Sequence, residues 1–96
     1  MSSLIWSAGS LEDVQRLYRF LEAKNKVAAR RAIATIRKAA AWLQTYPQLG
    51  RLATHLGPEY RQLPVPFGSE GYVVIYTEKN AVVTVLAVKH QKECSP

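Results

Sequence analysis

The sequence predicts a single α+β domain with the element order β-α-α-β-β-β, in which a helical hairpin packs on one face of an antiparallel sheet. Two observations carry this prediction. The stretch at 71–92, GYVVIYTEKNAVVTVLAVKHQK, contains two runs of β-branched and aromatic residues that are typical of paired strands. The stretch at 11–43 instead repeats apolar residues every three or four positions, which is typical of amphipathic helices. A chain of 96 residues has room for one domain, spanning 1–96.

The first predicted elements are a short strand and two helices. The apolar stretch SLIWS at 3–7 predicts the strand. Ser10 is the predicted N-cap of the first helix, and Asp13 completes a pattern that resembles a capping box. The second helix is expected to run from about Val27 to Thr45. It ends before Pro47 because the residue preceding a proline resists the α conformation.

The second helix is predicted to be basic on the side away from its apolar stripe. At about 100° per residue, Arg30, Arg31, Arg37 and Lys38 gather on that side. Trp42 lies near the side of Arg31 and Lys38 by the same geometry. The pattern fits either a face that binds phosphate or a partner, or the ordinary solvated back of an amphipathic helix.

A loop and three strands are expected after the helices. The loop covers 48–57, and an alternating pattern resumes at 60–65. Pro64 and Pro66 predict that this strand is short, bulged or at an edge of the sheet, because each proline lacks a backbone donor. A turn at 67–71 then leads into the final hairpin.

The final hairpin is the predicted centre of the sheet. Its turn is expected at 77–80, where Asn80 takes a positive φ at little cost. Tyr72 and Tyr76 lie on one face of its first strand, and we expect that face to be the one away from the helices. The two tyrosines would then share a surface with the basic tip of the second strand, which begins at Lys89.

The composition favours an anionic partner. Thirteen Lys and Arg against seven Asp and Glu give a net charge of +6, which suits nucleic acid or an acidic protein. Cys94 is the only cysteine and fits a reducing cytoplasm. No apolar run approaches the roughly 18 residues of a membrane helix. His55 has no neighbour at metal-ligand spacing. We therefore expect a cytoplasmic protein with no cofactor, no metal and no membrane partner.

Several landmarks follow one another along nearly the whole chain. They are Trp6-Ser7, the helical hairpin, Pro47-x-x-Gly50-Arg51, Tyr60-Arg61-Gln62-Leu63, GYVVIY at 71–76 and VLAVKHQKE at 85–93. In this order and spacing they resemble the RelE/ParE family of toxins from bacterial type II toxin–antitoxin modules. The resemblance implies a growth-arresting toxin held inactive by a co-expressed cognate antitoxin. An acidic segment of the antitoxin would wrap the toxin and fold as it binds.

Two mechanisms occur in that family, and the resemblance leaves both open. ParE-like members poison DNA gyrase, whereas RelE-like members act on the ribosome as mRNA endoribonucleases. The stretches YRQLPVPF, GYVVIY and VLAVKHQKE look like ParE-type sequences. RelE-like nucleases tend to carry an arginine where this chain has Val73, and a C-terminal aromatic that is missing after Lys92. A third reading, a non-toxic basic nucleic-acid-binding module, rests on charge alone. Whether the chain is an enzyme depends on which reading holds.

Seven residues are the candidates for catalysis or target contact: Arg51, Arg61, Tyr72, Tyr76, Lys89, His90 and Lys92. In a nuclease the Arg and Lys side chains would hold phosphate, and His90 would move a proton. Tyr72 or Tyr76 would stack on a base. In a gyrase poison the basic residues would be contacts rather than catalysts. Each candidate also has a structural reading, as a core tyrosine, an exposed ion pair or a solvated strand end.

Overall fold

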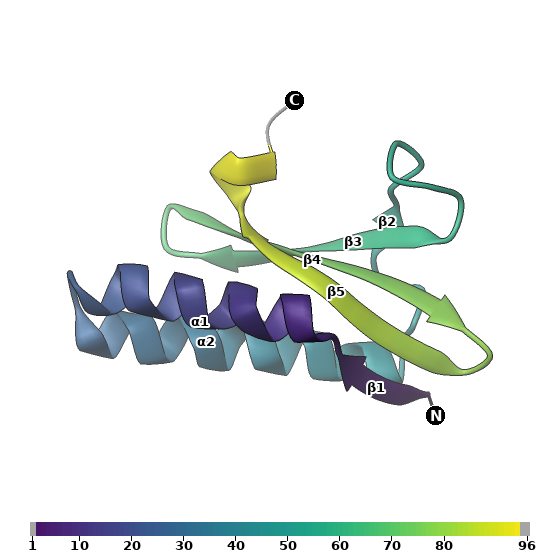
Figure 1. Ribbon diagram of the computed structural model, residues 1–96, viewed down its shortest axis with the longest axis horizontal. Coiled ribbons are helices and arrows are strands. Elements are labelled where there is room, and N and C mark those ends of the chain that lie inside the picture. Colours follow the sequence, from purple (N-terminus) through teal and green to yellow (C-terminus); the bar gives the residue numbers. More distant parts are fainter. Residues whose placement is uncertain (1, 95–96) are drawn as a thin grey trace.

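The computed structural model describes residues 2–94 and shows two helices lying against one face of a five-stranded sheet (Figure 1). In chain order the elements are β1 (Ser3–Trp6), α1 (Ala8–Glu22), α2 (Lys26–Ala41), the 3-10 helix η1 (Trp42–Gln44), β2 (Arg51–Leu52), β3 (Tyr60–Phe67), β4 (Glu70–Lys79), β5 (Val82–His90) and the 3-10 helix η2 (Gln91–Cys94). The predicted order β-α-α-β-β-β is confirmed. The short strand β2 is an addition within the predicted loop.

The sheet has the strand order β1-β5-β4-β3-β2 and is mixed rather than wholly antiparallel. β1 runs parallel to β5, with Ser3 opposite Val82 and Trp6 opposite Val85. The other three pairs are antiparallel, as predicted. No hairpin turn joins β1 to β5, so nothing in the chain forces them to be antiparallel. β5 therefore has a neighbour on each side, which agrees with the predicted place of the final hairpin at the centre of the sheet.

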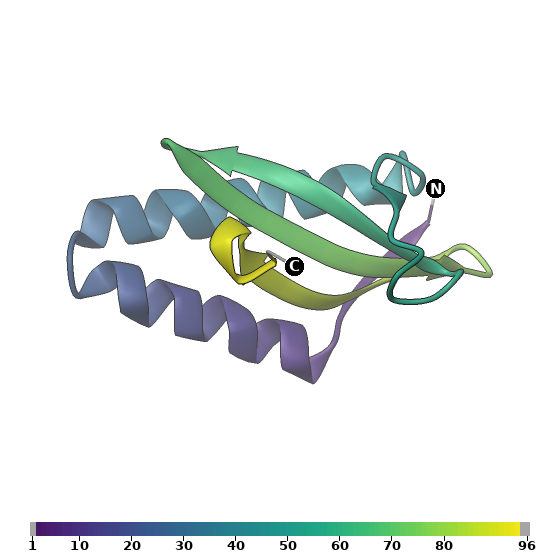
Figure 2. The ribbon, with the colours of Figure 1, turned by 90° about the horizontal axis from the view of Figure 1, so that it is seen from above.

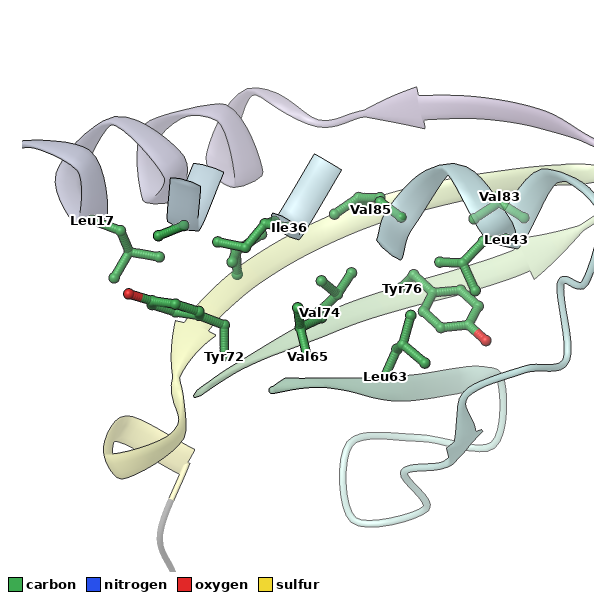
Figure 3. Packing of buried hydrophobic residues seen from close by; sticks show 13 residues of the cluster. Leu17, Ile36, Leu43, Leu63, Val65, Tyr72, Val74, Tyr76, Val83 and Val85 are labelled. Carbon is green, nitrogen blue, oxygen red and sulfur yellow. The ribbon is translucent and has the colours of Figure 1, made fainter. Parts of the chain in front are cut away.

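The two helices lie side by side against the sheet and bury alternate residues of β4 (Figures 2 and 3). Tyr72, Val74 and Tyr76 are at most 4% exposed and pack in one cluster with Leu17 of α1 and Ile36 of α2. The prediction that the tyrosine face is open was therefore wrong. An alternation of period two defines two faces without saying which one the helices cover. Aromatic rings supply the volume that the core of a small domain needs.

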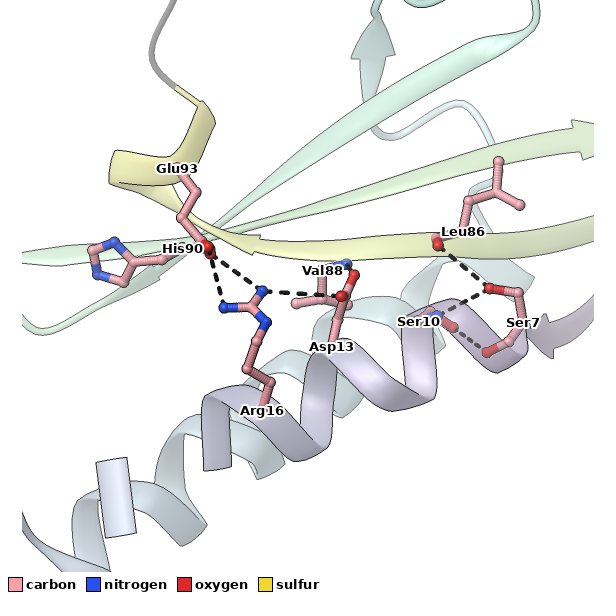
Figure 4. A network of polar contacts seen from close by, with 8 residues as sticks. All are labelled: Ser7, Ser10, Asp13, Arg16, Leu86, Val88, His90 and Glu93. Carbon is pink, nitrogen blue, oxygen red and sulfur yellow. Dashed lines mark hydrogen bonds and ion pairs between the residues drawn. The ribbon is translucent and has the colours of Figure 1, made fainter. Parts of the chain in front are cut away.

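The first helix begins one turn earlier than predicted (Figure 4). Its N-cap is Ser7, whose Oγ accepts a hydrogen bond from Ser10 N at 3.1 Å and donates one to Leu86 O at 3.3 Å. Ser10, the predicted cap, is buried inside α1. Asp13 is not a capping residue, because its carboxylate accepts from Val88 N at 3.0 Å and ties α1 to β5. Both serines are good caps, and the end of β1 at Trp6 selects the earlier one.

The second helix lies where it was predicted, with two adjustments at its ends. Asn25 caps its N-terminus by accepting a hydrogen bond from Ala28 N at 3.0 Å. The α-helix ends at Ala41, and η1 continues it to Gln44 with the tighter 3-10 geometry that is common at helix ends.

The hairpin between β4 and β5 closes through two residues with positive φ. Asn80 has a φ of 53°, which confirms its predicted conformation, and Ala81 has a φ of 61°. A two-residue turn of this kind matches the twist of the flanking strands and needs both residues in the left-handed region. The positive φ of Ala81 could not be predicted, because alanine rarely adopts this conformation.

The edge of the sheet formed by β3 is only partly covered. β2 pairs with β3 only at Arg61 and Gln62. Further along β3, the exposed residues Pro64 and Pro66 have no backbone N–H to offer to an added strand. The prediction that these prolines mark an edge agrees with this arrangement.

Candidate functional site

The candidate tyrosines are separated from each other and from part of the basic tip. Residues directly opposite each other in an antiparallel pair lie on the same face. Tyr72 lies opposite His90, so both belong to the face that the helices cover, at the C-terminal end of β5. Tyr76 lies opposite Arg61 on the same face, four positions further along β4. The predicted surface shared by both tyrosines and the basic tip is therefore not formed.

Two of the candidate cations belong to the other, open face of the sheet. Lys89 lies opposite Val73, and Arg51 lies opposite Gln62. Strands lie about 4.8 Å apart, and β2 is three steps from β5, so the bases of these two side chains are about 14 Å apart across the sheet. The positive charge therefore does not converge into one patch as predicted.

The end of β5 carries a group of paired charges that we call the sheet-end cluster. Its members are Arg16, Glu70, Tyr72, His90, Lys92 and Glu93. The two terminal nitrogens of Arg16 donate to the two oxygens of Glu93, at 3.1 and 3.4 Å (Figure 4). Lys92 Nζ lies 3.4 Å from Glu70 Oε1, and His90 Nε2 lies 3.7 Å from Glu70 Oε2. Arg16 and Lys92 therefore each lie against a carboxylate of the same chain, and the ring of His90 lies beside the carboxylate of Glu70.

Glu93 is the centre of the polar contacts that fix η2. Its carboxylate accepts a hydrogen bond from His90 N at 2.8 Å in addition to the bonds from Arg16. The backbone bond from His90, and then the guanidinium of Arg16, hold the pKa of Glu93 below its usual value against the opposing effect of partial burial. Lys92 N donates to His90 Nδ1 at 3.1 Å, so this ring nitrogen is already used as an acceptor.

A hollow of about 600 Å³ lies between the sheet-end cluster and α1. Leu17 and Phe20 supply its apolar wall, and the ring of Tyr72 meets the ring of His90 edge-on at 5.5 Å between centroids. Burial, and then the negative charge of Glu70, raise the pKa of Tyr72. Tyr72 is only 4% exposed, so the predicted stacking of its ring on a nucleic-acid base was wrong.

Tyr76 and Arg61 support a loop instead of facing a target. The Tyr76 hydroxyl donates to Pro47 O and accepts from Gly50 N, both at 2.8 Å. Arg61 Nη1 donates to Gly50 O at 2.7 Å. Burial raises the pKa of Tyr76, while the bond from Gly50 and the charge of Arg61 act in the opposite direction. Tyr76 has no exposed surface, so a stacking role for it was also wrong.

A second hollow, which sequence reasoning missed, lies on the helical hairpin. It has a volume of about 310 Å³ and is lined by Trp6, Leu11, Val14, Gln15, Tyr18, Arg19, Ile33 and Arg37. We call it the hairpin groove. Leu11 is 50% exposed in it, and the exposed cations Arg19 and Arg37 belong to its wall. The available signal was the apolar stripe of the first helix, because Leu11, Val14 and Tyr18 of that stripe line the groove.

A family model for the ParE toxin of type II toxin-antitoxin system, parDE, matches this chain over residues 4–94. The chain belongs to the ParE toxin family. The resemblance of the sequence to the RelE/ParE toxins is thereby confirmed on its ParE side. Among solved structures, the fold is similar to one titled "Chromosomal ParDE TA system from P. aeruginosa". That match has a TM-score of 0.77 at 19% identity and covers 94% of this chain and 96% of the other. No curated protein matches the chain.

This ParE-family chain has further features that bear on its chemistry. Within residues 2–94, no three His, Cys, Asp or Glu side chains lie close enough together to hold a metal ion. None of the helices in that range is long and apolar enough to cross a membrane. Cys94 carried no predicted role, and its side chain lies outside the described ones.

Proposed function

We propose that this ParE-family chain arrests growth by poisoning DNA gyrase through protein contacts, and that a cognate antitoxin neutralises it. The observation that carries the first part is the pairing of charges in the sheet-end cluster. Arg16 is held by Glu93, and both His90 and Lys92 lie against Glu70. Arg16 and Lys92 would have to leave their carboxylates before they could hold a phosphate.

RNA cleavage makes demands that this arrangement meets poorly. A base must activate the ribose hydroxyl, cations must stabilise the charged transition state, and an acid must protonate the leaving oxygen. His90 uses Nδ1 to accept from the backbone of Lys92. Arg61 donates to the backbone of Gly50, and the two candidate tyrosines are buried. These contacts support a gyrase poison over a RelE-like ribosome-dependent mRNA endoribonuclease.

Two of the predicted contact residues remain candidates on the open face. Arg51 is exposed, and Lys89 is partly exposed. Neither forms an ion pair with the residues that the structure describes. In the proposed function they contribute charge to the encounter with an acidic protein surface, because unpaired surface cations act mainly on association rate.

The hairpin groove supports the proposal of an antitoxin partner. Its floor is apolar, with Leu11 half exposed, and Arg19 and Arg37 stand beside it. An amphipathic segment that places apolar side chains in the groove and carboxylates on the two arginines would fit this chemistry. The net charge of +6 adds attraction for an acidic segment.

The test of the target is induction of the protein in cells with two readouts taken in parallel. We expect growth arrest with loss of plasmid supercoiling or broken DNA, and with intact transcripts by primer extension. Cuts at defined positions of mRNA, with unchanged DNA, would contradict the proposal and support the nuclease. No growth defect at all would support the non-toxic nucleic-acid-binding module.

The test of the antitoxin site is a charge placed in the hairpin groove. Leu11→Asp buries a carboxylate against the antitoxin, so we expect the affinity for the cognate antitoxin to fall about tenfold or more while growth arrest persists. Val27→Asp is the matched control, because Val27 is 58% exposed and lies outside the groove. Equal antitoxin affinity for the two variants would place the antitoxin elsewhere.

A further inference from the structure

An exposed aromatic patch lies at the end of α2, outside both sites described above. Trp42 is 52% exposed and Tyr46 is 54% exposed, and their rings stack with centroids 5.9 Å apart. Leu49 is 52% exposed and lines a hollow together with Trp42 and with Pro64 of β3. We call Trp42, Tyr46, Leu49 and the neighbouring Lys38 the α2-flank patch. Clustered Trp, Tyr and Leu side chains at the surface are typical of protein interfaces.

The loop that carries Leu49 is held in place by buried polar groups. The hydroxyl of Tyr76 bonds to Pro47 O and Gly50 N on the two sides of Leu49. Arg61 adds a bond to Gly50 O. Because the loop is fixed in this way, Leu49 is presented to solvent without the entropy cost of ordering a flexible loop on binding.

The cations beside the patch have no carboxylate partners among residues 2–94. Lys38 lines the same hollow as Trp42, and Arg31 lies two turns earlier on the same side of α2. Neither forms an ion pair with any described residue. Arg31 and Lys38 therefore present positive charge that an acidic partner can neutralise.

The α2-flank patch and the hairpin groove lie on opposite sides of α2. Ile33 lines the groove and Trp42 belongs to the patch. They are nine positions apart, which at about 100° per residue puts them about half a turn apart around the helix. A single helical segment in the groove therefore leaves the patch exposed.

We infer that the α2-flank patch is the surface through which this toxin engages its protein target, and that the target presents an apolar segment flanked by carboxylates. The inference rests on the proposed function, in which that target is DNA gyrase. It assigns the antitoxin and the target to different surfaces. Charge complementarity with Arg31 and Lys38 is the feature that selects an acidic partner.

Other occupants fit the patch less well. A second copy of the chain would bring another +6 charge against the same cations. An added strand finds no donors at Pro64 and Pro66 beside the patch. RNA is less favoured because one face of Trp42 and one face of Tyr46 are already occupied by the other ring, and Leu49 offers only aliphatic surface.

The test compares two patch variants with two controls in a supercoiling assay with purified host gyrase. The patch variants are Trp42→Ala and Lys38→Glu. The controls are Val27→Ala, which truncates another exposed apolar side chain, and Lys26→Glu, which makes the same charge change at the other end of α2. We expect the patch variants to need about tenfold or more protein for half inhibition, and the controls to stay within about twofold of the wild type. The affinity for the antitoxin is expected to stay within about twofold in all four.

Each alternative has its own result. Unchanged gyrase inhibition by both patch variants would overturn the inference, as would weakened antitoxin binding with normal inhibition. Dimers of the wild type that the patch variants break, measured by sedimentation, would also overturn it.

If the wild type arrests growth without affecting gyrase, the proposed function fails. In that case, if only the patch variants fail to arrest growth and the wild type leaves transcripts intact, the patch is upheld as the surface for another protein target. If the wild type instead cleaves mRNA and the patch variants do not, the inference is overturned.

Discussion

The sheet-end cluster and the α2-flank patch both combine aromatic and basic residues, yet they differ in what their cations contact. In the sheet-end cluster, Arg16 and Lys92 each lie against a carboxylate of the same chain. In the α2-flank patch, Lys38 has no such partner among the described residues, and Trp42 is half exposed. A cation that is already paired stabilises the fold slightly, whereas an unpaired one is available to a partner.

The two regions also differ in the burial of the polar groups that hold them in place. Glu93 fixes η2 from the surface, where solvent screens its bonds, and its side chain is 39% exposed. Tyr76 has no exposed surface and fixes the loop at 47–50, which we call the patch loop, from the core. A buried hydrogen bond costs more to lose than an exposed one, because the groups left behind are desolvated. We therefore expect the position of the patch loop to depend strongly on Tyr76, and the position of η2 to depend only weakly on Glu93.

The largest effect is expected for Gly50→Ala. A Cβ at this position would lie 2.7 Å from Tyr76 Oη and 2.8 Å from Gln62 O, so the loop or the tyrosine must move. We expect a loss of about 2–3 kcal/mol in the free energy of unfolding, or about 10–20 °C in Tm, measured by thermal denaturation. Gly9→Ala is the control, because its nearest neighbour atom is 3.7 Å away in ordinary contact. Equal Tm values for the two variants would show that the loop yields without cost.

A smaller effect is expected for Tyr76→Phe. The change keeps the ring in the core and removes only the hydroxyl, which leaves Pro47 O and Gly50 N without their partner. We expect a loss of about 1–2 kcal/mol by chemical denaturation, together with weaker gyrase inhibition through the patch loop. Tyr60→Phe, at a partly exposed tyrosine, should change neither quantity. Full stability of Tyr76→Phe would mean that water replaces both bonds and that the loop is not held from the core.

The smallest effect is expected for Glu93→Gln in the sheet-end cluster. The pKa of Glu93 is lowered in the folded state, so its contribution to stability is present above its ordinary pKa of 4.5 and is lost as the pH falls through the lower folded value. For an exposed pair this contribution is under about 1 kcal/mol. We expect the variant to be slightly less stable at pH 7, and the difference from the wild type to disappear once the pH is below the lowered folded-state pKa of Glu93.

Glu12→Gln, at an exposed glutamate of α1, is the matched control for this pH titration. A gap between the wild type and Glu93→Gln that widens as the pH falls would contradict the assigned sign. A loss of several kcal/mol at neutral pH would mean that the sheet-end cluster is a buried, stabilising network rather than a surface one.

The order of the helices and strands could be predicted from the sequence, because apolar periodicity and helix-breaking residues such as proline act locally. The helical stripe, the paired apolar runs and Pro47 predicted which elements form and in which order. The parallel pairing of Ser3 with Val82 could not be predicted, because it joins strands from the two ends of the chain. The first turn of α1 was misplaced because Ser7 and Ser10 are equivalent as caps until the end of β1 is known.

The site was less predictable than the fold, because it depends on which face of the sheet the helices cover. The two tyrosines were correctly predicted to lie on one face of β4, but that face was expected to be open and is the buried one. The pairing of Arg16 with Glu93 joins residues 77 positions apart, so no local pattern reveals it. Trp42 and Lys38 line the same hollow, as their spacing predicted, because a helix face follows from spacing alone.

One comparison tests most directly whether the α2-flank patch or the sheet-end cluster engages the target. Purified Trp42→Ala and His90→Ala are each titrated against host gyrase in the supercoiling assay, with antitoxin affinity as the check on folding. We predict that Trp42→Ala loses about tenfold or more in inhibition, whereas His90→Ala inhibits like the wild type. Normal inhibition by Trp42→Ala together with loss of inhibition in His90→Ala would contradict the account and return the working surface to the end of β5.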